Sequence, residues 1–153
     1  MSEHRIDLSW RREGAPFARE GYPRDHGIAF SGGQRLAASS APGYGGNPAH
    51  ADPEELLLAA LSSCHMLTFI AVCANRSYVV DAYDDPALAV LGKDEEGRTA
   101  VTHVTLKPRV RFADGKAPPV DEFQRFHERA HRACFIGNSV RTKVDIEPTL
   151  LGS

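Results

Sequence analysis

The sequence has almost no net charge, and this removes one class of function at the outset. Its 153 residues include 18 lysines and arginines against 20 aspartates and glutamates, for a formal net charge of −2. A nucleic-acid-binding face needs a surplus of basic residues, so we expect no nucleic-acid partner. Hydrophobic and charged fractions of 42% and 25% are ordinary for a soluble globular protein. The length predicts one domain over residues 1–153 with a core of its own.

The sequence also lacks a secretory leader and contains only three cysteines. No apolar segment follows the basic residue within residues 1–5, as a signal peptide would require. The longest apolar stretch, residues 56–74, is interrupted by four polar residues and preceded by acids, which favours a buried helix over a membrane span. We therefore expect a cytoplasmic protein without a membrane partner. In that compartment a cysteine pair is more often catalytic or metal-binding than a structural disulfide.

Several catalytic and nucleotide-binding motifs are missing as well. The sequence contains no Gly-x-Gly-x-x-Gly loop, no phosphate-binding Gly-Lys-Ser/Thr loop and no Gly-x-Ser-x-Gly nucleophile elbow. The glycine-rich residues 43–46 lack the flanking strand and helix that a phosphate loop requires. The sequence has no internal repeat or low-complexity tract either. These absences give no reason to expect an organic cofactor.

Alternating and turn-forming residues predict β-structure before the long apolar stretch. Residues 4–12 alternate apolar and polar side chains and predict a half-buried strand. Residues 28–30 and 34–38 flank a Ser-Gly-Gly turn and predict a hairpin. Residues 39–51 are rich in Gly, Pro, Ser and Asn, so they predict a loop and are the best candidate for a mobile lid.

The second half of the chain combines further strands with one helix. Residues 78–89, 101–112 and 140–146 predict strands, and the charged residues 93–98 predict a hairpin tip. Residues 118–134 predict a helix, because their apolar side chains recur at helical spacing. The order of strands, long helix, strands, helix and strand predicts an α+β fold with antiparallel hairpins at both ends.

The central helix begins with a strong start signal. Asp52 suits the cap, Pro53 suits the first helical position, and the acids that follow complement the helix N-terminus. We predict that the helix runs to about Asn75. Its side chains are apolar nearly all round, so it must be covered on every side. One short chain cannot easily supply that cover, and we expect an obligate homodimer in which two such helices pack together.

Two cysteines on the predicted helices are the first candidates for chemistry. Cys64 lies within the central helix and Cys134 at the end of the second. An inert packing role is common for a free cysteine, but the polar run Ser-Ser-Cys-His at residues 62–65 favours a helix that faces a pocket. Both interpretations stay open, because a disulfide needs Cα atoms within about 4.4–6.8 Å and the sequence shows no distance. Cys73 lies on the opposite face of the helix from Cys64, and we expect it to pack.

Arg24 and Glu54 are candidates for activating Cys64. A nearby arginine lowers a thiol pKa from about 8.5 to between about 3.5 and 7.5, and a carboxylate can orient that arginine through two hydrogen bonds. The alternatives are a surface arginine in a turn and an acid that complements the helix N-terminus. Ten residues separate Glu54 from Cys64, roughly 15 Å along a straight helix, so a shared site requires a broken helix or a second subunit.

A metal site on the second helix is a further alternative. His127, His131 and Cys134 follow i, i+4, i+7 spacing and share one helix face, which can hold zinc or another transition metal. Cys64 or His65 would supply a fourth ligand. The competing interpretation is a set of exposed histidines on a charged helix.

The chain resembles the OsmC/Ohr family of bacterial thiol peroxidases. Residues 52–65, Asp-Pro-Glu-Glu-Leu-Leu-Leu-Ala-Ala-Leu-Ser-Ser-Cys-His, are similar to the family's Asn-Pro-Glu-x-Leu…Ala-x-Cys signature. The resemblance includes Arg24 between two strands, Ser-Ala-Pro at residues 40–42, and Ala-His-x-x-Cys at residues 130–134. Asp52 stands where the family has Asn, and Phe-Ile-Gly follows Cys134 where the family often has Pro-x-Ser, as in a divergent branch.

The resemblance implies both an architecture and a reaction. It implies an intertwined homodimer in which antiparallel sheets wrap the central helices. It implies that Cys64 is the peroxidatic cysteine, Cys134 the resolving cysteine, and Arg24 with Glu54 the activating pair. We thus expect an enzyme that reduces organic hydroperoxides through a Cys64 sulfenic acid and a Cys64–Cys134 disulfide. An external dithiol, lipoyl in type by the resemblance, would restore the thiols, and no metal or organic cofactor is required.

Two other functions stay open at this point. A protein of the same fold without turnover could bind a small apolar ligand at the dimer interface or sense redox state through its cysteines. The metal-binding alternative through His127, His131 and Cys134 is the other.

Overall fold

The structure of the chain is a computed structural model that describes residues 1–152. The chain divides into two compact units, Met1–Leu56 and Leu57–Ser153. The elements of residues 1–152 are two α-helices, two single-turn 3₁₀ helices and three small sheets, which confirms the predicted α+β class. The organisation as one domain stays a prediction.

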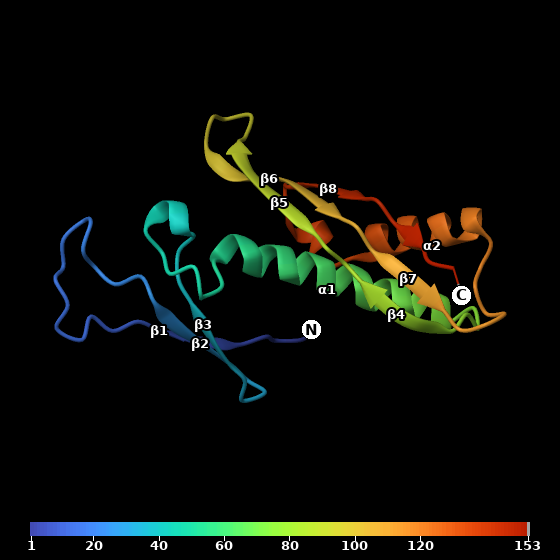
Figure 1. Cartoon of the computed structure of the whole chain (residues 1–153), viewed down its shortest axis with the longest axis horizontal. Helices are drawn as coiled ribbons and strands as arrows, with labels where there is room; N and C mark the ends of the chain where they lie inside the picture. The colour runs from blue at the N-terminus through green and yellow to red at the C-terminus, as the bar shows by residue number, and fades with distance from the viewer. Residues whose placement is uncertain (153) are drawn as a thin grey trace. The chain divides into compact units, whose positions relative to one another are not determined.

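The N-terminal unit contains one antiparallel sheet in the order β1-β2-β3 (Figure 1). β1 (Ile6–Ser9) pairs with β2 (His26–Phe30), which pairs with β3 (Arg35–Ala38). The predicted hairpin is confirmed, and its turn contains Gly33 at φ +85°, a conformation that favours glycine. The prediction of a half-buried first strand is wrong for the single chain, because every residue of β1 is exposed.

Hydrogen bonds close the base of the loop over residues 39–51. The Ser39 N–H donates to the Ala51 carbonyl at 3.0 Å, and the Asn47 N–H donates to Ser39 Oγ at 3.1 Å. The Asn47 side chain also donates to the Asp25 carboxylate at 3.1 Å, and this bond is the main cause that lowers the pKa of Asp25. These contacts fix the ends of the loop, and its movement as a lid stays a prediction.

Helix α1 (Pro53–Ala74) begins where its capping residues predict. The Glu55 N–H donates to Asp52 Oδ1 at 2.8 Å, and the Asp52 N–H donates to Glu55 Oε2 at 3.1 Å. This reciprocal capping box satisfies two amides that a helix start leaves free. The helix continues without a break for 22 residues and ends one residue before the predicted position.

Six strands of the second unit form two sheets, in the orders β4-β7-β9 and β5-β6-β8. Their bounds are Val80–Asp84, Leu88–Lys93, Thr99–Leu106, Arg109–Phe112, Lys143–Ile146 and Thr149–Leu150 for β4 to β9. β4 pairs with β7 and β5 pairs with β6 in antiparallel fashion, whereas β8 and β9 add in parallel. The predicted antiparallel hairpin after the central helix is confirmed as β5 and β6, whereas the last two strands join in parallel because the chain crosses over through a helix before it rejoins the sheets.

Prolines divide two of the predicted strands. The predicted strand over 78–89 separates into β4 and β5 around Pro86, and the one over 101–112 separates into β6 and β7 at Pro108. Proline has no N–H to donate to a ladder, so a strand interior excludes it. The charged hairpin tip over 93–98 is confirmed, with the Asp94 N–H donating to the Arg98 carbonyl at 2.9 Å.

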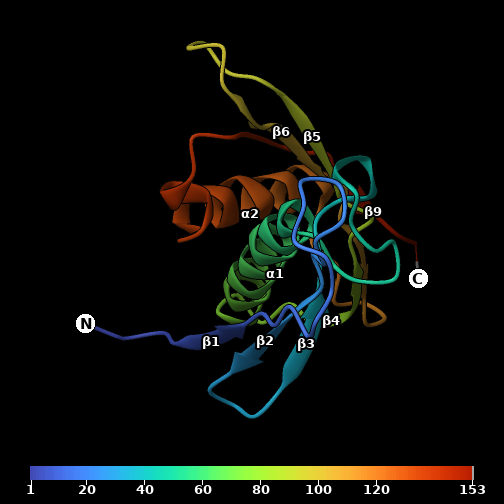
Figure 2. The same cartoon turned by 90° about the vertical axis from the view of Figure 1, so that its left-hand side faces the viewer.

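Helix α2 (Val120–Ala133) lies beside α1 within the second unit (Figures 1 and 2). One core of buried side chains joins α1, α2 and β7; it contains Phe69, Val72, Cys73, Val110, Phe112, Phe123, Phe126 and Ala130. A second core joins α1 to β6 through Leu61, Val104 and Leu106. Each of the larger side chains contributes about 1.5–3 kcal/mol through burial, so together they fix α1 between α2 and the strands.

Helix α1 buries only one side within the single chain. Its buried residues are Leu61, His65, Phe69, Val72 and Cys73. The side chains of Leu67 and Ile70 are 61% and 36% exposed. By length and composition alone α1 also suffices to cross a membrane, a property that it shares with core helices of soluble proteins. The uncovered side agrees with the predicted need for a second copy, which stays a prediction.

Candidate active site

Cys64 and Cys134 meet where α1 passes the end of α2. Cys64 lies in the middle of α1 and is half-buried, and Cys134 is the C-terminal cap of α2 and is 2% exposed. The two side chains are close enough for each to shift the pKa of the other. Both residues are free thiols. The structure thus brings together the two cysteines that the sequence singled out.

A tight turn after α2 holds Cys134 in this position. The Gly137 N–H donates to Cys134 Sγ at 3.3 Å, and the Asn138 N–H donates to the Cys134 carbonyl at 2.9 Å. A Cβ on Gly137 would lie 3.4 Å from the Cβ and 3.5 Å from the Sγ of Cys134, so the turn is closely packed against the thiol. The 3₁₀ helix η2 (Gly137–Ser139) continues this turn.

The surroundings of Cys64 favour its thiolate. Burial by itself raises the pKa of the Cys64 thiol, but donors around the sulfur reverse this and bring the pKa below its usual value. The donors are the Ile136 amide, the Cys134 thiol and the Phe135 amide, in decreasing order of effect, while the Thr68 hydroxyl donates to the Cys64 carbonyl at 2.8 Å. A sulfur that accepts several hydrogen bonds is stabilised as an anion, so Cys64 is the better nucleophile of the two.

The surroundings of Cys134 have the opposite effect. Burial raises the pKa of the Cys134 thiol, and the hydrogen bond that it donates to Cys64 raises it further. Cys64 therefore gives up its proton more readily than Cys134 does. This asymmetry gives one sulfur suited to attack and one thiol near it that holds its proton more firmly.

Arg24 belongs to the N-terminal unit, where its guanidinium contacts backbone and an aromatic ring. Nη1 donates to the Tyr22 carbonyl at 3.2 Å, Nη2 donates to the Arg19 carbonyl at 3.3 Å, and the charge lies 4.3 Å from the centre of the Tyr22 ring. Arg24 has no carboxylate partner within residues 1–152. Gly45, at φ +75°, passes close to it: a Cβ there would lie 3.2 Å from Arg24 Cζ. Its role beside Cys64 stays a prediction.

Glu54 lies in the first turn of α1, as a helix-dipole acid does. The helix is unbroken from Glu54 to Cys64, so roughly 15 Å of helix separates the two Cα atoms. Of the two conditions for a shared site, the broken helix is therefore excluded. Only a second subunit would allow Glu54 and Cys64 to act in one site.

The predicted metal-ligand set of His127, His131 and Cys134 is wrong. Residues 1–152 contain no group of three or more His, Cys, Asp or Glu side chains placed to hold a metal ion. His127 instead forms a hydrogen bond with His65 at 3.0 Å, from Nδ1 to Nε2, and both rings are buried. Cys134 has its partners in Cys64 and Gly137.

Of the polar residues beside Cys64 in the sequence, Ser62 and His65 bond to other parts of the chain, whereas Ser63 is exposed. Ser62 Oγ donates to the Asp85 carboxylate at 2.5 Å, and His65 bonds to His127. The sequence correctly marked the helix as unusual at this point, but the polar side chains are there to join α1 to its neighbours. Cys73 is fully buried, and burial raises its pKa to about 12, as an inert packing residue requires.

The family model that matches the chain is that of OsmC-like protein, over residues 45–149. This chain belongs to the OsmC-like family. The match contains α1, α2 and both cysteines of the candidate site. No curated protein matches the chain.

Solved structures agree with the OsmC-like family. An OsmC-like protein of unknown function from Vibrio cholerae O1 biovar eltor has 40% identity and a TM-score of 0.93, covering 97% of this chain and 99% of that chain. An organic hydroperoxide resistance protein from Elizabethkingia anophelis has 20% identity and a TM-score of 0.69, with 99% of each chain covered. The organic hydroperoxide resistance protein OhrB of Bacillus subtilis has 19% identity and a TM-score of 0.59, with 96% and 98% covered. The last two share the fold with this chain.

Part of the site in this OsmC-like protein lies beyond sequence reasoning. The amides of Phe135 and Ile136 are the main groups that donate to Cys64 from the turn, and backbone amides carry no residue-type signal. Thr68 is one helical turn after Cys64, and its spacing alone would have marked it as a neighbour. Pairing of His65 with His127 was also missed, because sequence spacing within one helix cannot show a partner on another.

Proposed function

We propose that this protein reduces organic hydroperoxides with Cys64 as the attacking sulfur and Cys134 as the resolving thiol. The observation that carries the proposal is the meeting of the two free thiols of α1 and the end of α2, in which Cys64 has a lowered pKa and Cys134 a raised one. Similarity in fold to two organic hydroperoxide resistance proteins supports the choice of substrate class.

The first step transfers one oxygen atom. The Cys64 thiolate attacks the distal oxygen of the hydroperoxide, and the O–O bond breaks with its electron pair going to the leaving alkoxide. The alkoxide takes a proton and departs as an alcohol, while Cys64 becomes a sulfenic acid. The amides of Phe135 and Ile136, which donate to the sulfur, keep it anionic before the attack.

The second step uses the neighbouring thiol. The sulfur of Cys134 attacks the sulfur of the sulfenic acid, water leaves, and the Cys64–Cys134 disulfide forms. An external dithiol then exchanges with the disulfide and returns two electrons, so that both thiols are restored. We propose a lipoyl-type dithiol in a cytoplasmic setting, and no metal or organic cofactor takes part.

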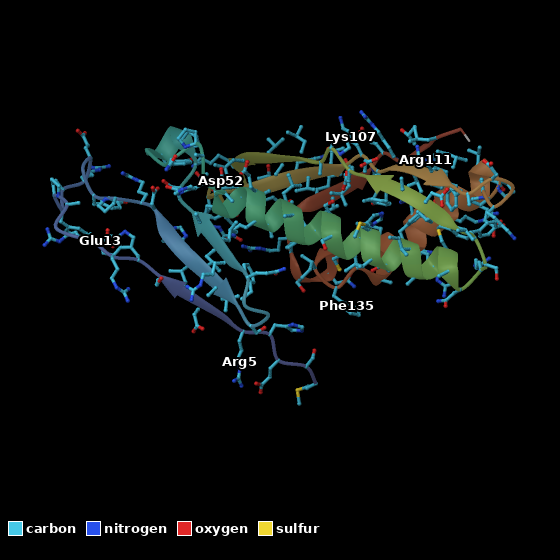
Figure 3. The ribbon with its side chains drawn as sticks, turned by 60° about the horizontal axis from the view of Figure 1, so that its bottom comes forward. Arg5, Glu13, Asp52, Lys107, Arg111 and Phe135 are labelled. Carbon is cyan, nitrogen blue, oxygen red and sulfur yellow. The ribbon has the colours of Figure 1, made fainter. Side chains whose placement is uncertain are left out.

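An exposed apolar side chain supports an organic substrate. Phe135 follows Cys134 directly, points outward in Figure 3 and is 80% exposed. Apolar surface beside the thiols would bind the hydrocarbon part of an organic hydroperoxide, which hydrogen peroxide lacks.

We propose that the active protein is a homodimer in which Arg24 and Glu54 form an activating pair. The uncovered side of α1 supports a second copy, because exposed Leu67 and Ile70 would be buried by it. The Arg24 guanidinium meets no carboxylate within residues 1–152, so it can accept one from a partner. An unbroken α1 requires that Glu54 acts on the Cys64 of another chain.

Thiol counting with cumene hydroperoxide tests the proposal. We expect the protein to lose two of its three thiols per chain, and a dithiol to restore them. Cys64→Ser should retain both remaining thiols, and Cys73→Ala should still lose two, because Cys73 is buried away from the pair. If no thiol is lost, the proposal is wrong, and a protein of this fold that binds a small ligand without turnover takes its place. Loss of thiols in Cys64→Ser would exclude Cys64 as the attacking residue.

A further inference from the structure

Two buried histidines connect the helices that carry the cysteines. His65 follows Cys64 directly on α1, and His127 lies two helical turns before Cys134 on α2. The side chains are 1% and 2% exposed. Neither residue takes part in the peroxide chemistry proposed above. Neither belongs to a cluster of side chains within residues 1–152 that could hold a metal ion.

The two rings meet edge to edge. Nε2 of His65 and Nδ1 of His127 are 3.0 Å apart, the ring planes differ by 11°, and the ring centres are 5.3 Å apart. The Phe69 ring, by contrast, lies face to face with His127, with centres only 4.0 Å apart. Near-parallel planes with a short N···N distance and distant centres mean that the bond lies close to both ring planes, as a directional N–H···N bond requires.

This bond needs one nitrogen that is unprotonated and can accept. A neutral imidazole has one N–H and one acceptor nitrogen, so one ring donates and the other accepts. Burial, with a smaller effect of a neighbouring histidine, lowers the pKa of His65 to about 4 and that of His127 to about 3. Protonation of the accepting nitrogen would place two N–H donors against each other and break the bond.

The outer nitrogens of the pair have no partner. His65 Nδ1 and His127 Nε2 are buried without a hydrogen bond within residues 1–152. Around them lie the rings of Phe69 and Phe123, the latter 4.7 Å from the centre of His127. The bond between the histidines is thus the sole polar attachment of both rings, in surroundings where an unpaired polar group is costly.

Within the bounds of α1 and α2, this is the one side-chain hydrogen bond between the two helices among the described residues, and Arg76 and Tyr78, just after α1, add bonds to Glu122 of α2. Beside the cysteines the helix contact is mainly apolar, and apolar contacts are non-directional, so they tolerate a shift of one helix along the other. A pair of apolar residues of similar volume would stabilise the contact about as well. Stability alone therefore does not explain two histidines at this position. A directional bond that fixes the position of one helix along the other does explain them.

We infer that the His65–His127 hydrogen bond is the positioning element that sets α1 against α2 and thereby holds Cys64 beside Cys134. His65 is adjacent to one cysteine in the chain, and α2 connects His127 rigidly to the other. A shift between the helices would move the two sulfurs apart. The inference rests on the proposed function where it concerns catalysis. The position of the two sulfurs relative to each other can be tested without it.

Matched substitutions separate the hydrogen bond from the volume of the side chain. Gln at position 65 places an amide nitrogen or oxygen near the site of Nε2, and Met at position 65 fills similar space without a polar atom. At position 127, Asn reproduces the site of Nδ1, and Leu is its apolar match. The variants are His65→Gln against His65→Met, and His127→Asn against His127→Leu.

The test measures how readily the Cys64–Cys134 disulfide forms in the full chain, with reduced and oxidised glutathione as the probe. In this exchange the protein dithiol and one oxidised glutathione give the protein disulfide and two reduced glutathiones, so thiols and electrons balance. We expect the Met and Leu variants to lower this equilibrium constant by roughly tenfold, the size of one directional hydrogen bond, and the Gln and Asn variants to stay within about threefold of wild type.

A double variant, His65→Met with His127→Leu, covers the case in which a single apolar variant does not fold. Removal of both rings leaves no unpaired imidazole, so we expect a folded protein with a lowered disulfide equilibrium constant. A folded double variant with the wild-type constant would overturn the inference, because the pair would then be structural only. Peroxide turnover does not enter this measurement. If the wild-type protein does not react with cumene hydroperoxide, the proposed function is wrong. The glutathione measurement would still decide whether the histidine pair positions the two cysteines.

Discussion

The two helices of the candidate site differ in how completely one chain covers them. Helix α2 is amphipathic, with Phe123, Phe126 and Ala130 buried and charged residues on its outer face. Helix α1 is apolar on nearly every side, yet only one side is buried within the single chain. The comparison teaches that α2 reaches its final environment within one chain, whereas α1 does so only with a further surface.

The thiols on the two helices differ in parallel with this. Cys134, at the end of α2, is buried and has a raised pKa, and Cys64, on the half-covered helix, is half-buried and has a lowered pKa. Burial suits a resolving thiol, but it would slow a peroxidatic thiol, because the attacking sulfur must be reached by the substrate. Under the proposed function, the half-covered side of α1 would contain both the interface with a second copy and the route to the sulfur.

Substitution of the cysteines should give the largest effect and the sharpest contrast. We expect Cys64→Ser to lower the rate of peroxide consumption by about 10³-fold or more, because no other residue replaces the sulfur. We expect Cys134→Ser to keep the first turnover within a few-fold of wild type and to stop at the sulfenic acid. Stopped-flow peroxide consumption with a sulfenic-acid trap measures both. Equal loss of the first turnover in the two variants would contradict the division of roles.

Truncation of Phe69 should give the largest loss of stability. Phe69 is fully buried on α1 and lies face to face with His127 at 4.0 Å. We expect Phe69→Ala to lower the free energy of unfolding by about 3–5 kcal/mol, through lost burial and the cavity that remains. Val120→Ala, at an exposed position of α2, should change it by less than about 0.5 kcal/mol. Urea denaturation of both variants checks this, and a loss below about 1 kcal/mol for Phe69→Ala would indicate that the core between the helices is looser than described.

A charge on each helix should separate the interface from the ordinary surface. We expect Leu67→Asp on α1 to weaken self-association by at least about tenfold, because a carboxylate would be buried without a partner. Gln124→Asp places the same charge on an exposed position of α2 and should leave association unchanged. Sedimentation velocity over a range of concentrations measures the dissociation constant. A monomeric wild-type chain would remove the dimer from the proposal, and an unchanged Leu67→Asp dimer would place the interface elsewhere.

The sequence predicted the elements better than their connections. The start of α1 was predictable because Asp52, Pro53 and Glu55 act locally, and the amphipathic pattern gave α2. The alternating pattern predicts two strands that are too long, because Pro86 and Pro108 end a strand where the alternation continues. The parallel addition of β8 and β9 depends on contacts with strands about 40 residues away, which no local pattern contains.

The site divides in the same way. Cys64 and Cys134 were predictable from their helices and from the family resemblance, but the cause of the lowered pKa of Cys64 was not. The sequence suggested a guanidinium, whereas the donors that the structure shows are mainly backbone amides of a turn. The spacing of His127 to His131 and Cys134 suggests a metal site as an alternative, because that spacing is visible in the sequence and the partner of His127 on α1 is not.

The pH dependence of stability should report the histidine pair that connects the two helices. Burial lowers the pKa values of His65 and His127 from the ordinary histidine value of 6.5 to about 4 and about 3, so the folded chain binds fewer protons than the unfolded chain below pH 6.5. The contribution of the pair is complete above about pH 6.5 and is lost as the pH falls toward 4. Each histidine that protonates on unfolding costs up to about 1.4 kcal/mol per pH unit in this window.

Urea denaturation between about pH 7 and pH 4.5, at one protein concentration, measures this slope. The carboxylates with lowered pKa, Asp25, Asp94 and Asp145, start from an ordinary aspartate value of 3.8 and lose their contribution mainly below this window, so the histidines dominate within it. In the His65→Met, His127→Leu double variant, the free energy of unfolding should change less with pH, because the two histidines no longer take up protons on unfolding. A wild-type chain whose stability is constant across this range would show that the rings are accessible to protons in the folded state, and the contact between α1 and α2 would then be open to water.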